Sequence, residues 1–233
     1  MQSTLAHRAS GGPRGGFLFP RLRVGFVFLI AALLGILAVI LDGDAVAADL
    51  SETTQLYRGG KYAECISACE KAIAENDFSE NYRLLKIRAE MELGRYEAAL
   101  KTLDEGIARF PYSLQLRWLG REVCQFNRQP ERAARLDVEI TQMVQQAPWR
   151  YSDAVNQIVV GRFYLSQGLD PKKVLDTVYN VVTKRQPTYV ETYLASGELA
   201  LDKNDFALAA EAYQQAIKLD VGEAAAHYGL ARA

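Results

Sequence analysis

The stretch that decides the fold covers residues 189–220 and reads YVETYLASGELALDKNDFALAAEAYQQAIKLD. Apolar and small side chains recur in it every three or four residues, both before and after the polar run 202–205, as one face of a helix requires. Gly197 and Ala209 are small at positions where two helices would touch. The stretch therefore predicts two amphipathic helices packed as a hairpin.

The hairpin pattern recurs with a period of 34 residues. Gly60 and Gly94 mark successive turns between two helices, and Tyr62 and Tyr96 follow them at the same spacing. A further 34-residue series of small residues consists of Cys65, Ala99 and Ala133. A single hairpin cannot bury its apolar faces alone, so units of equal length stack on one another.

This pattern resembles the tetratricopeptide repeat, which the stretch at 189–220 matches nearly end to end and whose period the 34-residue series shares. The resemblance implies an all-α fold, a right-handed α-solenoid of helix-turn-helix repeats. We expect an N-terminal apolar signal or anchor helix, within residues 1–48, to precede this solenoid. We expect units one to three in residues 49–147, a linker at 148–151, and units four and five plus a truncated sixth in 152–233.

Units three and four depart from the regular pattern. The turn at residues 126–130 lacks the Gly-x-aromatic pair, and we expect it to carry an extra residue. We expect a long second helix over residues 130–146. In the linker, Trp149 and Tyr151 are expected to pack against the stack because aromatic rings carry large apolar area, with a recognition role as the alternative.

Residues 1–48 have the three parts of an export leader. A basic start is followed by the apolar run VGFVFLIAALLGILAVIL at 24–41 and by small residues before Asp49. Either a signal peptide is cleaved after Ala47 or Ala48, or residues 24–41 stay as a membrane anchor. The arginines before the apolar run hold that end in the cytoplasm in both cases. We expect an exported bacterial protein, periplasmic or otherwise extracytoplasmic, or anchored in the inner membrane with its repeats outside the cytoplasm.

Composition argues against several function classes. The chain has 27 basic and 28 acidic side chains, so no strong positive field marks a nucleic-acid binder. Cys65 and Cys69 stand four apart on one helix, but no His or further Cys lies near in sequence to complete a metal site. Their apolar positions favour a role as core residues. We expect no disulfide, metal or cofactor.

The sequence contains no catalytic motif that we recognise. Its two histidines, His7 and His227, lie in the leader and in the incomplete last unit. No HExxH, phosphate-binding glycine loop or Gly-x-Ser-x-Gly is present. We therefore predict a non-catalytic scaffold that binds a protein or peptide partner and takes no small-molecule substrate.

The resemblance implies that the first helices of the units build a concave groove for that partner. The groove positions that it assigns are Arg88, Glu92, Arg117, Arg121, Gln125, Arg162, Glu191 and Glu198. Arginine presents a planar, bidentate donor set that suits a carboxylate, so an acidic segment is the expected ligand. The alternative is a solvated charged face with no ligand.

The run PWRYSDAVNQIVVGRFYLSQGLDPKKVLDTVYN, the strong repeat after it and the closing AHYGLARA also resemble the opening of large exported bacterial repeat proteins. Some of these carry a metallopeptidase-like domain far downstream. An alternative function is therefore the substrate- or partner-recruiting N-terminal portion of a larger exported enzyme.

Overall fold

The computed structural model describes residues 50–76 and 78–233 of the chain. In these residues the regular secondary structure is helical, with no strand. No helix among them is both long enough and apolar enough to cross a membrane. The leader predicted at residues 1–48 lies outside the described residues.

The first described helical segment covers residues 50–58. The elements after it are α2 (Tyr62–Glu75), α3 (Glu80–Glu92), α4 (Tyr96–Arg109), α5 (Leu114–Phe126), α6 (Pro130–Gln146), the 3₁₀ helix η1 (Pro148–Tyr151), α7 (Ala154–Ser166), α8 (Pro171–Val174), the π turn η2 (Leu175–Tyr179), α9 (Asn180–Arg185), α10 (Val190–Asp202), α11 (Phe206–Leu219) and α12 (Ala224–Arg232). The predicted long helix at 130–146 is confirmed by α6.

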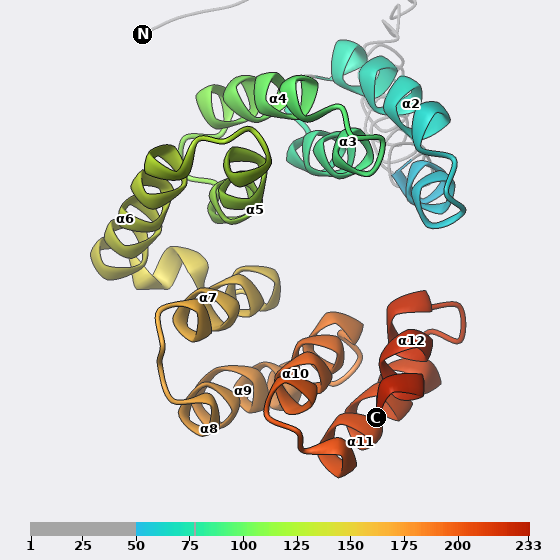
Figure 1. Cartoon of the computed structure of the whole chain (residues 1–233), viewed down its shortest axis with the longest axis vertical. Coiled ribbons are helices and arrows are strands. Elements are labelled where there is room, and N and C mark those ends of the chain that lie inside the picture. Colours follow the sequence, from blue (N-terminus) through green and yellow to red (C-terminus); the bar gives the residue numbers. More distant parts are fainter. Residues whose placement is uncertain (1–49, 77) are drawn as a thin grey trace, which may run out of the picture. The chain divides into compact units, whose positions relative to one another are not determined.

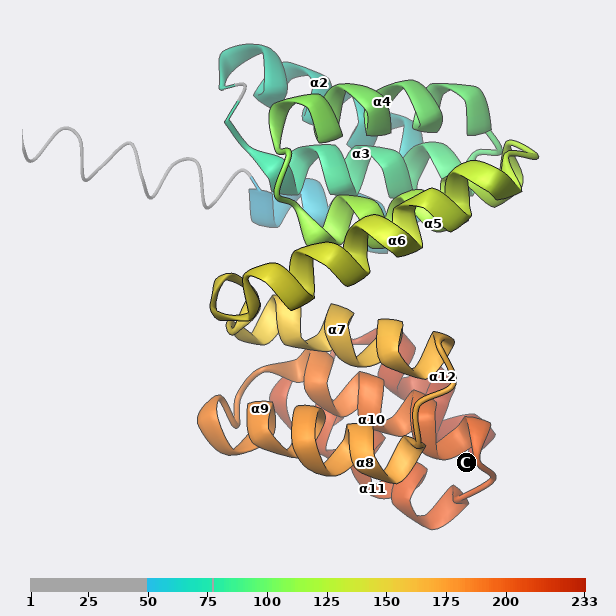
Figure 2. The ribbon, with the colours of Figure 1, turned by 90° about the vertical axis from the view of Figure 1, so that its left-hand side faces the viewer.

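These helices form consecutive hairpins, which we call units one to five. Unit one is residues 50–58 with α2, unit two α3 with α4, unit three α5 with α6, unit four α7 with α8 to α9, and unit five α10 with α11. Helix α12 packs against both α10 and α11. Within residues 50–233, α3, α5, α7 and α10 lie on the inner side of a curved stack, and α4 and α6 on its outer side (Figures 1 and 2). The prediction of an all-helical repeat fold is confirmed.

The turns inside units one to three have the same length. Gly60, Gly94 and Arg128, each 34 residues from the next, adopt left-handed backbone conformations with φ of 73°, 68° and 57°. The prediction of an extra residue in the turn of unit three is therefore wrong, because Arg128 adopts the conformation that glycine adopts at lower cost. The longer turn lies in unit four, where residues 167–170 separate α7 from α8.

The linker residues Trp149 and Tyr151 have opposite environments. Tyr151 is 3% exposed and packs with Ile140 and Phe163, as expected. Trp149 is 73% exposed, so the prediction that it packs against the stack is wrong. The two residues stand two apart on the short helix η1 and differ in burial, which the sequence pattern does not reveal.

All three cysteines are buried and have free thiols. Cys65 and Cys69 belong to the core between units one and two, and Cys124 to the core between units two and three. Burial raises the pKa of the Cys69 thiol far above its usual range, with a smaller contribution from Cys65. These cysteines are therefore packed as small apolar residues.

Candidate functional site

Two overlapping hollows lie on the inner side of the stack. The larger has a volume of about 490 Å³ and is lined by Arg88, Gln115, Trp118, Leu119, Arg121, Glu122, Gln125, Phe126, Val159 and Arg162. The other has a volume of about 360 Å³ and is lined by Tyr57, Arg88, Gln115, Val155, Ile158, Val159, Arg162, Tyr189 and Glu191. Because four lining residues are shared, we treat the two hollows as one site and call it the groove.

The groove has apolar walls. Phe126 is 50% exposed and stacks on Tyr96, with ring centroids 4.9 Å apart. Trp118 is partly buried, and Val155 and Val159 project from successive turns of α7. These side chains offer apolar contact area along α5 and α7, which suits an extended protein segment better than a free ion.

Arg162 is neutralised by acids from the next unit. It forms ion pairs with Glu191 (2.8 Å) and with Glu198 (3.1 Å), both on α10. The three side chains therefore hold α7 and α10 together, and two of them, Arg162 and Glu191, also line the groove. The charge available to a ligand at this point is small.

Arg121 and Arg117 are also paired within the stack. Arg121 lies over the Trp118 ring, with its guanidinium carbon 4.5 Å from the ring centroid, and pairs with Asp137 of α6. Arg117 is only 7% exposed, pairs with Glu139 at 2.7 Å and donates to the backbone oxygen of Ser113. Arg117 thus lies between α5 and α6, away from the groove lining.

Arg88 differs from the other three arginines. It is exposed, lines both hollows, and has no ion pair or hydrogen bond among residues 50–76 and 78–233. Nearby Glu92 accepts a hydrogen bond from the hydroxyl of Tyr57, 3.3 Å away. Arg88 therefore has guanidinium donors in the groove that no described side chain occupies.

Two tyrosines accompany Arg88 in the smaller hollow. Burial, with the charge of Glu92 second, raises the pKa of Tyr57 to about 12, and burial followed by Glu191 raises the pKa of Tyr189 to about 12. Both phenols therefore stay protonated near neutral pH and keep their O–H donors. The hollow combines a guanidinium with two neutral hydroxyl groups.

The structure distributes the eight predicted residues as follows. Five of them, Arg88, Arg121, Gln125, Arg162 and Glu191, line the groove. Glu198 lines an adjacent hollow with Arg162, and Glu92 binds Tyr57. Arg117 is buried elsewhere.

Sequence reasoning missed several lining residues, which are the acid Glu122 and a larger set of uncharged side chains. Gln115, Trp118 and Glu122 stand ten, seven and three residues before Gln125, so they share its helical face. Val155 and Val159 stand seven and three residues before Arg162 in the same way. Helical periodicity alone could therefore have identified these five residues. Tyr57 and Tyr189 line the groove because the curvature of the stack brings units one and five near it, which periodicity does not show.

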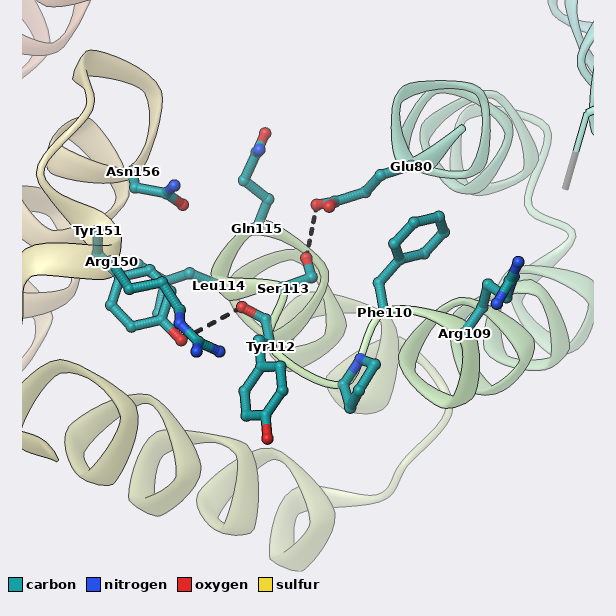
Figure 3. Close-up of a pocket in the computed structure, with 11 residues that line it drawn as sticks. Glu80, Arg109, Phe110, Tyr112, Ser113, Leu114, Gln115, Arg150, Tyr151 and Asn156 are labelled. Carbon is teal, nitrogen blue, oxygen red and sulfur yellow. Dashed lines mark hydrogen bonds between the residues drawn. The ribbon is translucent and has the colours of Figure 1, made fainter. Parts of the chain in front are cut away.

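A separate hollow of about 310 Å³ lies where the loops between units two, three and four meet (Figure 3). The hydroxyl of Ser113 donates to Glu80 (2.6 Å), and the hydroxyl of Tyr151 donates to the backbone oxygen of Tyr112 (3.3 Å). The Arg150 guanidinium lies over the Tyr112 ring at 4.1 Å from its centroid. These contacts join one unit to the next. We therefore assign the residues around this hollow a structural role in packing the units together.

The described residues, 50–76 and 78–233, bring no three His, Cys, Asp or Glu side chains together in a way that would hold a metal ion.

Comparison with known proteins shows which proteins the sequence and the fold resemble. The sequence matches the tetratricopeptide repeat family over residues 54–114 and 194–233. The fold is similar to that of a tetratricopeptide repeat protein of Thermus thermophilus, with a TM-score of 0.57, 20% identity, and coverage of 80% of this chain and 97% of that one. It is also similar to human IFIT1, solved as a dimer with m7Gppp-AAAA, with a TM-score of 0.55, 15% identity, and coverage of 80% and 45%. At these identities the likeness shows the fold alone. No curated protein sequence matches the chain.

Proposed function

We propose that the chain, whose sequence matches the tetratricopeptide repeat family over residues 54–114 and 194–233, is a non-catalytic interaction scaffold and holds an extended protein segment in the groove. The observation that carries this proposal is the continuity of the two hollows across α3, α5 and α7. Apolar side chains cover the walls, and amides and guanidinium groups stand beside them. This combination gives contact area together with a few orienting hydrogen bonds.

In this proposal, the bound segment of the partner carries an acidic residue at the point where it contacts Arg88. Asp137, Glu191 and Glu198 compensate Arg121 and Arg162, whereas Arg88 has no acidic partner among the described residues. A carboxylate from the ligand would give Arg88 the bidentate partner that the stack gives to the others. Positive charge at this point also favours the approach of an acidic partner over a basic one.

The test uses the full chain and a pair of fluorescent peptides. One peptide repeats Leu-Asp-Tyr-Asp, and the other has Asn in place of Asp. We expect the acidic peptide to bind more tightly, and Arg88→Glu to weaken it about tenfold or more, as the loss of a charge-assisted hydrogen bond would. The effect should shrink with added salt.

A matched control is Arg95→Glu, which makes the same charge change at an exposed arginine in the turn before α4. This variant should bind both peptides like the wild type. Equal binding of the two peptides, or equal losses in the two variants, would contradict the acidic groove.

We also propose that the scaffold acts outside the cytoplasm. Support comes from the sequence alone, from the apolar run at 24–41 and the small residues before Asp49. N-terminal sequencing of the protein from fractionated cells tests this. A start at Asp49 or at the preceding Ala48 indicates a cleaved signal, an intact leader in the inner membrane indicates an anchor, and recovery of the intact chain from the cytosol contradicts export.

A further inference from the structure

The two ends of the repeat stack touch through an ion-pair cluster. Arg58, at the end of the first helical segment, pairs with Asp220 at 3.1 Å and with Glu223 at 2.8 Å. These partners lie 162 and 165 residues further along the chain. Repeat units ordinarily contact only their neighbours, so a contact between the first unit and the loop before α12 closes the stack on itself. Figure 1 shows the first helical segment and α12 on the same side of the curve.

The cluster lies next to one wall of the groove. Tyr57, which lines the smaller hollow, immediately precedes Arg58 in the chain. Tyr189, at the start of α10, lines the same hollow from unit five. Asp220 and Glu223 lead into α12, and α12 packs against α10. The ion pairs therefore connect the helix that carries Tyr57 to the helices beside Tyr189.

This closure is weak enough to open. The side chains of Arg58 and Asp220 are 49% and 34% exposed, and exposed ion pairs contribute little to stability and are screened by salt. Glu223 is more buried, and its carboxylate also caps the backbone N–H of Ala225. The cluster thus biases the position of unit one without locking it.

We propose that Arg58, Asp220 and Glu223 form a clasp that closes the stack around a bound segment, and that Tyr57, Arg88 and Tyr189 form a subsite for a carboxylate of that segment in the closed state. This inference rests on the proposed groove function. The Arg88 guanidinium supplies the charge and paired N–H donors, and Tyr189 adds a neutral hydroxyl donor from unit five. Tyr57, whose hydroxyl donates to Glu92, forms the side of the subsite that unit one contributes. The subsite is complete only when both ends of the stack are together.

The first experiment measures closure without a ligand. Cysteines placed at the exposed positions Gln55 and Val221 carry spin labels, since the three native thiols are buried. Pulsed electron paramagnetic resonance then gives the distance distribution between unit one and the loop before α12. We expect Arg58→Gln to lengthen and broaden this distribution, and high salt to do the same to the wild type.

The matched control is Lys61→Gln. It removes one positive charge three residues away, from a side chain whose ion pair is with Glu64 on the next helix turn. This variant should leave the distance distribution unchanged. Identical distributions for the wild type and Arg58→Gln would overturn the clasp.

The second experiment separates the clasp from the groove. With the Leu-Asp-Tyr-Asp peptide, we expect Arg58→Gln to speed dissociation and weaken binding by about fivefold at most, the range for exposed ion pairs. Arg88→Gln should weaken binding about tenfold. In the double variant the losses should be less than additive, because Arg88 acts in the closed state. Additive losses would mean that the carboxylate subsite does not depend on closure.

Two further peptides identify the source of the carboxylate. One has internal Asp residues and an amidated C-terminus, and the other has Asn residues and a free C-terminus. If Arg88→Gln weakens only the peptide with internal Asp residues, the subsite binds side-chain carboxylates. If it weakens only the peptide with the free C-terminus, the subsite binds a terminal carboxylate. If Arg58→Gln changes nothing while Arg88→Gln weakens binding, the groove function stands and the clasp fails. If the wild type binds none of the peptides, the groove function itself fails.

Discussion

The N-terminal and C-terminal units bring their helices together with different side chains. In units two and three, glycines face leucines. A Cβ added to Gly106 would lie 3.2 Å from Cδ1 of Leu116, and one added to Gly120 would lie 2.9 Å from Cδ2 of Leu103. The ends of leucine side chains can rotate, so these contacts can yield by a few tenths of an ångström.

In units four and five and in α12 the glycines face tyrosine rings. A Cβ on Gly161 would lie 2.3 Å from Cε1 of Tyr179, and Cβ atoms on Gly197 and Gly229 would lie 2.7 Å and 2.2 Å from Cζ of Tyr213. A buried ring cannot fold away as a leucine methyl group can, because its atoms move together. The comparison indicates that glycine is more strictly required in the C-terminal units.

The largest expected effect on stability comes from removing the ring of Tyr213, against which two glycines pack. Tyr213 is 3% exposed and lies between Gly197 and Gly229. Tyr213→Ala should lower the free energy of unfolding by about 3–5 kcal/mol, the range for deleting a buried aromatic ring. Urea unfolding followed by circular dichroism measures this. Tyr228→Ala, at a 68% exposed position of α12, is the control and should change little.

The second largest effect is expected from adding a methyl group at Gly161, which faces the ring of Tyr179. Gly161→Ala should destabilise by about 1–3 kcal/mol, because Tyr179 must move to admit the methyl group. Gly106→Ala makes the same change against a leucine and should cost less. Equal losses for the two variants would remove the distinction between the two halves of the stack.

The fold was predictable because its signals are local and repeat. The 34-residue spacing of Gly60, Gly94 and their following tyrosines is a property of the sequence, and the stack follows from the need to bury apolar faces. The turn of unit three was predicted wrongly because Arg128 takes a conformation usually associated with glycine. The exposure of Trp149 and the burial of Tyr151 depend on the path of the backbone in η1. This four-residue helix is too short to show a periodic pattern in the sequence.

The groove was only partly predictable because charge compensation is not local. Helical register places Arg121 and Arg162 on inner faces, but their partners Asp137, Glu191 and Glu198 come from other helices. Arg117 has the same residue type as its neighbour Arg121 and a different environment. The contact of Arg58 with the loop before α12 depends on the curvature of the whole stack.

A smaller effect is expected from exchanging residues in the left-handed turns. Arg128→Gly should stabilise by up to about 1 kcal/mol, because glycine adopts φ of 57° without the steric cost that a side chain carries. Gly94→Ala, at φ of 68°, should destabilise by a similar amount. Thermal unfolding of both variants measures the two changes in stability. Shifts of the same sign would show that the turns of units two and three are not equivalent.

The smallest expected effect concerns the Tyr179 hydroxyl, which is buried and has no hydrogen-bond partner among the described residues. Tyr179→Phe removes an unsatisfied polar group and keeps the ring against Gly161, so stability at neutral pH should stay within about 1 kcal/mol of the wild type or rise. Burial raises the pKa of Tyr179 to about 12, above the usual 10. The folded state therefore holds this proton more tightly than the unfolded state, and the resulting stability is lost as the pH rises from about 10 to about 12. Urea unfolding across that window should show a smaller loss for Tyr179→Phe than for the wild type, since Tyr57 and Tyr189 titrate in both proteins. Marked destabilisation at neutral pH would instead show that the hydroxyl has a partner, and the ring of unit four would then be held by more than its packing against glycine.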